Sequence, residues 1–283
     1  MINKITIIGV GLIGGSLAKA IKENNLAKVV FGFGRDSNRL EEAQKLNVID
    51  QFSTNLQEAI SGSTIVVIAT PVGAFREILN EIKPFINDKI IISDVGSTKT
   101  NITSIVEQIL GNHSNCFIPA HPIAGKEKSG FEASESNLFI NKKVIITPLE
   151  TNSSDSINLI QKMWEDIGAE VDFMSPESHD ELLGMTSHLP HMLAFSLVNY
   201  LISQNPSASI YAAGGFKDFS RIASGDAVMW RDICLQNKEQ IISHIKGYQK
   251  ILDSLVDAIE DKNSEKLDLL FTNAKNTRDS WVG

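Results

Sequence analysis

A loop near the middle of the chain combines imidazole, carboxylate and ammonium groups. Residues 120–130 read AHPIAGKEKSG, so His121 is followed within ten residues by one glutamate, two lysines and two glycines. Because the unperturbed pKa of histidine lies near neutral pH, an imidazole placed after a strand and before such a loop suits proton transfer. We therefore predict that His121 is a general base.

A glycine-rich segment near the start of the chain has the spacing of a phosphate-binding turn. Residues 9–16 read GVGLIGGS and follow a short β-branched run directly. In this pattern Gly9 makes the tight turn, Gly11 lets the backbone approach a pyrophosphate, and Gly14 allows close helix–strand packing. The segment therefore predicts a dinucleotide cofactor. Its proposed contacts are Gly9, Gly11, Leu12, Ile13 and Gly14.

The end of the second predicted strand bears on which nicotinamide cofactor binds. Residues 31–37 read FGFGRDS. If the strand ends at Phe33, Gly34 occupies the position that is usually acidic in NAD sites, and Arg35 follows, which favours the 2′-phosphate of NADP. If the strand runs two residues further, Asp36 binds the ribose and NAD fits. We expect NADP to be favoured and NAD to be possible.

Two more loops follow predicted strands, at the edge where open α/β sheets bind ligands. Thr70 and Pro71 follow the third of the strands named below, and we expect both beside the cofactor. Residues 94–100 (DVGSTKT) follow the fourth and lack the first glycine of a P-loop, which argues against nucleoside triphosphate binding. Ser97 and Thr98 suit helix N-caps, and a cap that faces the cleft also presents its hydroxyl to a substrate.

Histidine and basic residues recur in the second half of the chain. His188 and His191, three residues apart, can share one face of a helix, as in a metal site. Cys116 is the only plausible third ligand, so we predict no metal. The alternative is that these imidazoles project into a cleft and bind a carboxylate.

Residues 214–223 read GGFKDFSRIA and contribute Lys217 and Arg221. The planar guanidinium of arginine matches a carboxylate, so this segment is a candidate anion site. The alternative for Arg221 is a surface ion pair with Asp218 or Asp226.

The elements that must position these residues fall into two classes. In the first half, β-branched runs alternate with helical patterns, which predicts an α/β fold with a doubly wound, mostly parallel sheet of Rossmann type. The strands are Lys4–Ile8, Val29–Phe33, Thr64–Ala69, Lys89–Ser93, Asn115–Pro119 and Val144–Thr147, and the helices include Ser16–Glu23, Arg39–Leu46, Ala74–Ile82 and Asn101–Leu110.

Past about residue 174 the strand patterns stop. Ser187–Ser203 is apolar almost all round, which predicts a helix buried in a helical assembly. A heptad-like seam follows, suited to antiparallel packing or a subunit interface. Its members are Ile241, Ile245, Tyr248, Leu252, Leu255 and Ile259. We therefore predict a dinucleotide-binding domain over residues 1–173 and an all-helical domain, binding substrate and forming a homodimer, over residues 174–283.

The composition limits the partners. The 283 residues carry 26 basic and 34 acidic side chains, a net charge of −8, which argues against nucleic acid. No apolar run approaches the roughly 20 residues of a membrane span, and the start lacks the features of a signal peptide. Cys116 and Cys234 form no CxxC, which fits a reduced protein. We expect a cytoplasmic protein that acts on a small molecule.

Taken together, the motifs resemble the prephenate/arogenate dehydrogenase family of tyrosine biosynthesis. The resemblance covers essentially the whole chain, in the right order. It rests on GVGLIGGS at residue 9, DVGSTKT at 94, HPIAGKEKSG at 121, SHLPH at 187, GFKDFSRI at 215 and WRD at 230. It implies a Rossmann-type domain, a helical dimerisation domain, and an NAD(P)-dependent oxidative decarboxylation that turns a cyclohexadienyl ring aromatic.

The resemblance also implies roles for single residues. His121 matches the histidine that bonds the ring hydroxyl and assists its deprotonation, and Ser97 matches the serine that orients both. Arg221 matches the arginine that binds substrate carboxylate. The remaining positions associated with the substrate pocket are His191, His188 and Glu127, with Lys217 as a further cationic group.

Two other functions fit parts of the sequence. A β-hydroxyacid-dehydrogenase-like reductase shares the Rossmann-plus-helices plan, but places a catalytic lysine where the segment Ser187–Ser203 has none. A non-catalytic NADPH sensor would bind cofactor without turnover. Because the chain ends at Gly283, we expect no appended regulatory or chorismate mutase domain. The choice between prephenate and arogenate, and inhibition by tyrosine, stay open.

Overall fold

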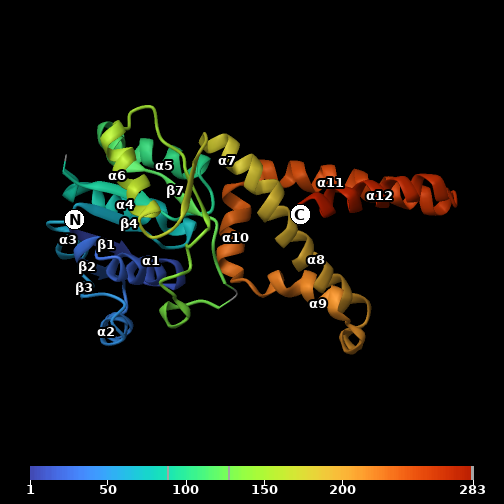
Figure 1. Cartoon of the computed structure of the whole chain (residues 1–283), viewed down its shortest axis with the longest axis horizontal. Coiled ribbons are helices and arrows are strands. Elements are labelled where there is room, and N and C mark those ends of the chain that lie inside the picture. Colours follow the sequence, from blue (N-terminus) through green and yellow to red (C-terminus); the bar gives the residue numbers. More distant parts are fainter. Residues whose placement is uncertain (88, 127, 282–283) are drawn as a thin grey trace. The chain divides into compact units, whose positions relative to one another are not determined.

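The computed structural model describes residues 1–87, 89–126 and 128–281. The chain forms two compact units, Met1–Lys238 and Glu239–Gly283 (Figure 1). The first contains both β-sheets and the shorter helices, and the second contains two long helices. All candidate site residues belong to the first unit.

The main sheet has six strands in the order β3-β2-β1-β4-β5-β6, with every neighbouring pair parallel. Its strands are short β-branched runs covered on both faces, as parallel sheets require. They are β1 Ile2–Ile8, β2 Ala27–Phe33, β3 Gln51–Ser53, β4 Ile65–Ile68, β5 Ile91–Asp94 and β6 Phe117–Ile118. This arrangement confirms the predicted α/β, Rossmann-type class.

Helices between these strands complete the crossovers. They are α1 Leu12–Glu23, α2 Ser37–Lys45, α3 Leu56–Ile60, α4 Phe75–Ile82 and α5 Thr100–Leu110. The core joins β1 to α1 and to α6 (Ser154–Glu165): Ile7, Leu17 and Trp164 are fully buried in one apolar cluster. The sheet edge at the carboxyl ends of β1, β4 and β5 is therefore held rigidly.

A second, three-stranded sheet follows: its middle strand overlaps the predicted strand Val144–Thr147, whereas the sequence patterns did not predict its two outer strands. β7 (Ala120–Pro122) runs antiparallel to β8 (Lys143–Ile146), and β9 (Glu170–Phe173) runs parallel to β8. The predicted strand Asn115–Pro119 is divided between a 3-10 turn, Gly111–Cys116, and β6. Pro119 lies between β6 and β7, and its carbonyl accepts a hydrogen bond from Thr147 N at 3.0 Å.

After β9 the described chain is helical up to residue 238, as predicted. The helices are α7 Pro176–Leu183, a π-turn Gly184–His188, α8 Leu189–Gln204, α9 Gly214–Ser220, a 3-10 turn Arg221–Ser224 and α10 Ala227–Gln236. The π-turn precedes Pro190, whose missing N–H interrupts the regular α-helical ladder.

The helix predicted over Ser187–Ser203 is only partly buried by its own chain. In α8 only Ala194 is buried, while Tyr200 and Ile202 are 64% and 53% exposed. The segment is apolar on every side, but neighbouring elements of one chain cover only part of it.

The second unit contains α11 from Glu239 onward and α12 (Ser264–Ser280), and α12 runs back along α11 (Figure 1). α11 as a whole covers Lys238–Glu260. Of the predicted seam, Leu252 and Ile259 are 43% and 58% exposed. Across the described part of the chain, no helix is both long and apolar enough to cross a membrane.

Candidate active site

The turn between β1 and α1 has the shape that a bound pyrophosphate requires. Gly9 has a φ of +96°, and a Cβ at Gly14 would lie 2.2 Å from the carbonyl oxygen of Gly9. Both positions therefore need glycine. Gly11 caps α1 without a side-chain bond, and a Cβ there would meet no atom within 4 Å. The helix N-terminus is thus open to an anion.

The end of β2 carries the residues that the sequence predicts for the adenosine side of such a cofactor. The strand ends at Phe33, so Gly34 and then Arg35 follow it. The Asp36 carboxylate caps α2, accepting from the backbone N–H groups of Asn38 at 2.9 Å and Arg39 at 3.2 Å. The Asp36 carboxylate therefore serves as the N-cap of α2.

Thr70 and Pro71 follow β4, next to the glycine turn. A Cβ at Gly9 would lie 2.9 Å from the Thr70 methyl group, so the two loops touch. The Thr70 hydroxyl oxygen is buried and makes no hydrogen bond to any part of the chain that the structure describes. Buried hydroxyl groups normally form a hydrogen bond, so a bound ligand would supply the partner that is missing here. The glycine turn, the open helix end and this hydroxyl together fit a dinucleotide.

A cavity of about 400 Å³ lies beyond this turn, in the first unit. Its wall includes the start of α1, the loops after β5 and β7, and ten residues between Leu183 and Ile233. Seven residues predicted for cofactor or substrate line it together: Leu12, Ile13, Ser97, His121, His188, His191 and Arg221. The fold thus brings together residues that lie up to 209 positions apart in the sequence.

Other predicted site residues lie elsewhere. Lys217 is exposed on α9 and does not line the cavity. Arg35 is exposed at the end of β2. Glu127 lies outside the described residues.

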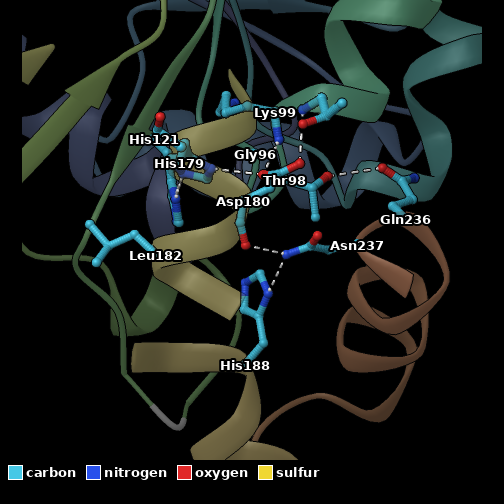
Figure 2. A network of polar contacts seen from close by, with 12 residues as sticks. Gly96, Thr98, Lys99, His121, His179, Asp180, Leu182, His188, Gln236 and Asn237 are labelled. Carbon is cyan, nitrogen blue, oxygen red and sulfur yellow. Dashed lines mark hydrogen bonds and ion pairs between the residues drawn. The ribbon is translucent and has the colours of Figure 1, made fainter. Parts of the chain in front are cut away.

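His121 is the middle residue of β7 and is only 9% exposed. Its Nδ1 atom lies 2.8 Å from Nε2 of His179 on α7 (Figure 2). Burial lowers the pKa of His121 well below 6.5, and the neighbouring His179, Lys99 and His188 lower it further. The ring is therefore neutral at pH 7, as a proton acceptor must be.

A fully buried ion pair fixes the loop that carries Ser97. Lys99 Nζ lies 2.5 Å from Asp94 Oδ2, and both side chains are 0% exposed. The same carboxylate accepts from the backbone N–H groups of Gly96 at 2.8 Å and Ala120 at 3.0 Å. Asp94 therefore ties the Ser97 loop to the strand of His121.

The predicted capping role of Ser97 and Thr98 is wrong. α5 begins at Thr100, and its first N–H groups are satisfied by the Asp180 carboxylate. Asp180 accepts from Lys99 N at 2.8 Å and from Thr100 N at 2.9 Å. The Thr98 hydroxyl instead lies 3.1 Å from the side-chain oxygen of Gln236.

His188 and His191 occupy different surroundings at the start of α8. His191 Nδ1 lies 2.8 Å from the Ser187 carbonyl, and its ring stacks on Trp230 at a centroid distance of 3.8 Å. His188 is buried and bonded to Asn237. Burial lowers the pKa of His188 to about 4. Within the described ranges, no three potential ligands cluster around a metal site.

Four residues near the cavity escaped the sequence analysis: His179, Asp180, Trp230 and Asn237. His179 and Asp180 are adjacent on a helix, where neighbouring side chains normally point apart, so their spacing carried no signal. Trp230 was part of a motif without an assigned role. Nothing in the pattern distinguished Asn237 from a residue at a helix end.

Both halves of the chain match models of the same protein family. Residues 17–173 match the family model "Prephenate dehydrogenase, nucleotide-binding domain", and residues 175–273 match "Prephenate dehydrogenase, dimerization domain". Prephenate dehydrogenase of Bacillus subtilis is 36% identical, over 99% of this chain and 76% of that protein. Cyclohexadienyl dehydrogenase of Zymomonas mobilis is 32% identical, over 93% and 90% respectively.

A solved structure agrees over the whole chain. Prephenate dehydrogenase from Aquifex aeolicus, in complex with hydroxyphenyl propionate and NAD⁺, superposes with a TM-score of 0.93 at 37% identity, covering 99% of this chain and 98% of that one. The glycine turn, the buried imidazole and the matching models lead to one conclusion: the chain belongs to the prephenate dehydrogenase family.

Proposed function

We propose that the chain oxidises and decarboxylates prephenate or arogenate, giving 4-hydroxyphenylpyruvate or tyrosine, with a nicotinamide cofactor. The observation that carries this proposal is one cavity whose wall includes Leu12 and Ile13 of the glycine turn, the buried His121 and the cationic residue Arg221. Family membership supports the same reaction.

The reaction balances with one base and no net proton. The ring carbon that bears the hydroxyl loses a hydride, for which the cofactor supplies the acceptor. His121 holds the hydroxyl proton while carbonyl character develops. The carboxyl group leaves as CO₂, its electron pair enters the ring, and the ring oxygen recovers the proton as a phenol. Aromatisation drives the sequence, so the protein mainly positions groups.

Charge complementarity assigns the other side chains. The Arg221 guanidinium binds a substrate carboxylate, and the Ser97 hydroxyl orients the ring hydroxyl beside His121. His191, stacked on Trp230, faces the side-chain end of the substrate, and His188 lies in the same pocket. Lys217 and Glu127 remain predictions as substrate contacts.

We propose that NADP is favoured over NAD. Three features support this: β2 ends at Phe33, Gly34 offers no carboxylate, and Arg35 follows. The competing interpretation needed Asp36 for the ribose, but that carboxylate already caps α2. Gly9, Gly11 and Gly14 would hold the pyrophosphate, and Thr70 and Pro71 would border the cofactor.

We further propose a division of labour along the chain and a homodimer. Residues 1–173 bind the dinucleotide, and residues 174–283 complete the substrate site and dimerise. The exposed apolar side chains of α8 and α11, such as Tyr200, Ile202 and Ile259, support a subunit interface in the helical part. A cytoplasmic location remains a prediction.

The test is an initial-rate assay at 340 nm that crosses prephenate and arogenate with NAD and NADP. We expect reduced cofactor to form with at least one substrate, and a higher kcat/KM with NADP. Cofactor binding without turnover on either substrate would refute the proposed reaction and favour the sensor. A higher kcat/KM with NAD would refute only the cofactor preference.

A further inference from the structure

A continuous set of polar contacts connects the two buried imidazoles of the cavity wall (Figure 2). From His121 it passes to His179 at 2.8 Å and from His179 Nδ1 to Asp180 Oδ1 at 2.8 Å. From there, Asn237 Nδ2 lies 2.8 Å from the Asp180 carbonyl and 3.1 Å from His188 Nδ1. Because each contact needs one donor and one acceptor, the set constrains where every proton lies.

The Asp180 carboxylate determines where the protons lie at one end of this set of contacts. Both of its oxygens accept backbone N–H groups from the start of α5. Burial alone would raise the pKa of Asp180, but the bonds from His179 and from this backbone outweigh burial and lower it. An ionised carboxylate only accepts, so His179 must carry its proton on Nδ1.

The position of the proton on His179 determines the position of the proton on His121. With its proton on Nδ1, a neutral His179 offers a lone pair at Nε2, so His121 must donate from its own Nδ1. Burial lowers the pKa values of both rings, which keeps them neutral. The nitrogen that remains to His121 is Nε2, with a free lone pair. This is the tautomer that a base requires.

At the other end of this set of contacts, the His188 ring carries its proton on the opposite nitrogen. The Asp180 carbonyl can only accept, which forces the NH₂ group of Asn237 toward it, and the same NH₂ group faces His188 Nδ1. His188 therefore accepts at Nδ1 and carries its proton on Nε2. That Nε2 atom is buried and makes no well-formed hydrogen bond among the residues that the structure describes, although a backbone contact with Ser97 favours the protonated ring. Because the ring lines the cavity, an N–H group there can donate to a bound ligand in place of this weak backbone contact.

We propose that His179, Asp180 and Asn237 are positioning residues that set the two imidazoles to opposite roles, His121 as proton acceptor and His188 as hydrogen-bond donor to a substrate oxygen. The inference rests on the proposed function for the identity of the substrate, but the tautomers themselves belong to the protein alone. The cavity wall would then distinguish two substrate oxygens. One gives up a proton to His121, and the other accepts a hydrogen bond from His188.

The direct test is a ¹H–¹⁵N correlation spectrum of the ring nitrogens in the full-length protein labelled with ¹⁵N-histidine, at pH 7 without ligand. The chain has six histidines, and loss of signals in His121→Asn and His188→Asn assigns the two that matter. We expect the Nδ1–H form for His121 and the Nε2–H form for His188, with exposed His113 as reference. The same tautomer in both rings, or a protonated ring, would overturn the proposal even if the enzyme turns over.

Two substitutions test the consequence. In Asp180→Asn an amide NH₂ can donate to His179 and invert the proton order, so we expect kcat to fall roughly a thousandfold with little change in KM. In Asn237→Asp a carboxylate would accept from His188 Nδ1, moving the donor away from the cavity, so we expect KM for the substrate to rise about tenfold or more.

Controls separate these effects from misfolding. Asp155→Asn and Asn112→Asp make the same chemical changes at exposed sites outside the helical part and should leave both parameters unchanged. If Asp180→Asn does not fold, because it also loses the cap of α5, the spectrum of Asn237→Asp still decides: its His188 must lose the Nε2–H form. Wild-type kinetics in a folded Asp180→Asn or Asn237→Asp variant, or an unchanged His188 tautomer in Asn237→Asp, would contradict the proposal.

Discussion

The Nδ1 atom of His121 lies 2.8 Å from the Nε2 atom of His179, although 58 residues separate them in the chain. His121 belongs to a strand of the small sheet, and His179 to the first helix after it. The contact therefore joins the first of the two predicted domains to the second. It also gives the His121 ring a defined orientation in the protein alone.

The glycine turn gives a matched pair of variants. A Cβ at Gly14 would lie 2.2 Å from a backbone oxygen, whereas one at Gly11 meets open space. Gly14→Ala should therefore lower the free energy of unfolding by about 1–3 kcal/mol. Gly11→Ala should leave it unchanged but raise the dissociation constant of NADP. Thermal unfolding and calorimetry measure the two effects. Equal stability of both variants, or unimpaired binding by Gly11→Ala, would contradict this use of the turn.

Cofactor preference should reverse on two substitutions at the end of β2. Gly34→Asp with Arg35→Ala supplies a carboxylate for a ribose hydroxyl and removes the cation for a 2′-phosphate. A lost charge-assisted bond corresponds to about 1.5–3 kcal/mol, so the NADP:NAD ratio of kcat/KM should fall roughly tenfold to a hundredfold. Arg76→Ala, at an exposed position on α4, is the control. A ratio that stays constant in the double variant would mean that the preference resides elsewhere.

Arg221 should act on substrate binding. Because it lines the cavity and a substrate carboxylate needs a cationic partner, Arg221→Ala should raise KM roughly tenfold to a hundredfold. Lys217→Ala offers a comparison, since Lys217 is exposed and outside the cavity wall. Steady-state kinetics of both variants decide the matter. An unchanged KM in Arg221→Ala would leave Arg221 a structural role only.

Acid should destabilise the fold in a defined range. Burial lowers the pKa of His188 from 6.5 to about 4, so below pH 6.5 the unfolded chain binds a proton that the folded chain refuses. Stability from this group is complete above pH 6.5 and is lost as pH falls toward 4, by about 3 kcal/mol. Denaturant unfolding from pH 7 to 4 should show a smaller loss in His188→Gln, and the wild-type loss in His113→Gln. Identical pH dependence in the three proteins would refute the assignment.

Much of the fold followed from local patterns. Buried strands such as Ile65–Ile68 are continuous β-branched runs, and the glycine turn has a fixed spacing, so both were visible in the sequence. Most of the small sheet was not, because β7 and β9 are short and pair with β8, which lies far from β7 in the sequence. The exposed faces of α8 were also hidden, since apolar composition does not say which chain covers a helix.

The candidate site also contains residues that the sequence predicts and residues that it does not. His121, Ser97 and Arg221 lie in recognisable motifs and meet in one cavity. Asp180 does not, because its role depends on reaching the start of α5, 80 residues earlier in the chain. Contacts between side chains and distant backbone groups leave no local pattern. The capping role expected of Ser97 and Thr98 failed for this reason.

The central claim is that the imidazole of His121 accepts the hydroxyl proton while hydride leaves the same carbon. The most direct test compares NADPH formation at 340 nm by the wild-type protein and by His121→Asn, with His113→Asn as control and substrate affinity measured separately. We predict that His121→Asn binds substrate normally while kcat falls by roughly 10²–10⁴. A kcat within a few-fold of wild type, at unaltered affinity, would contradict the account.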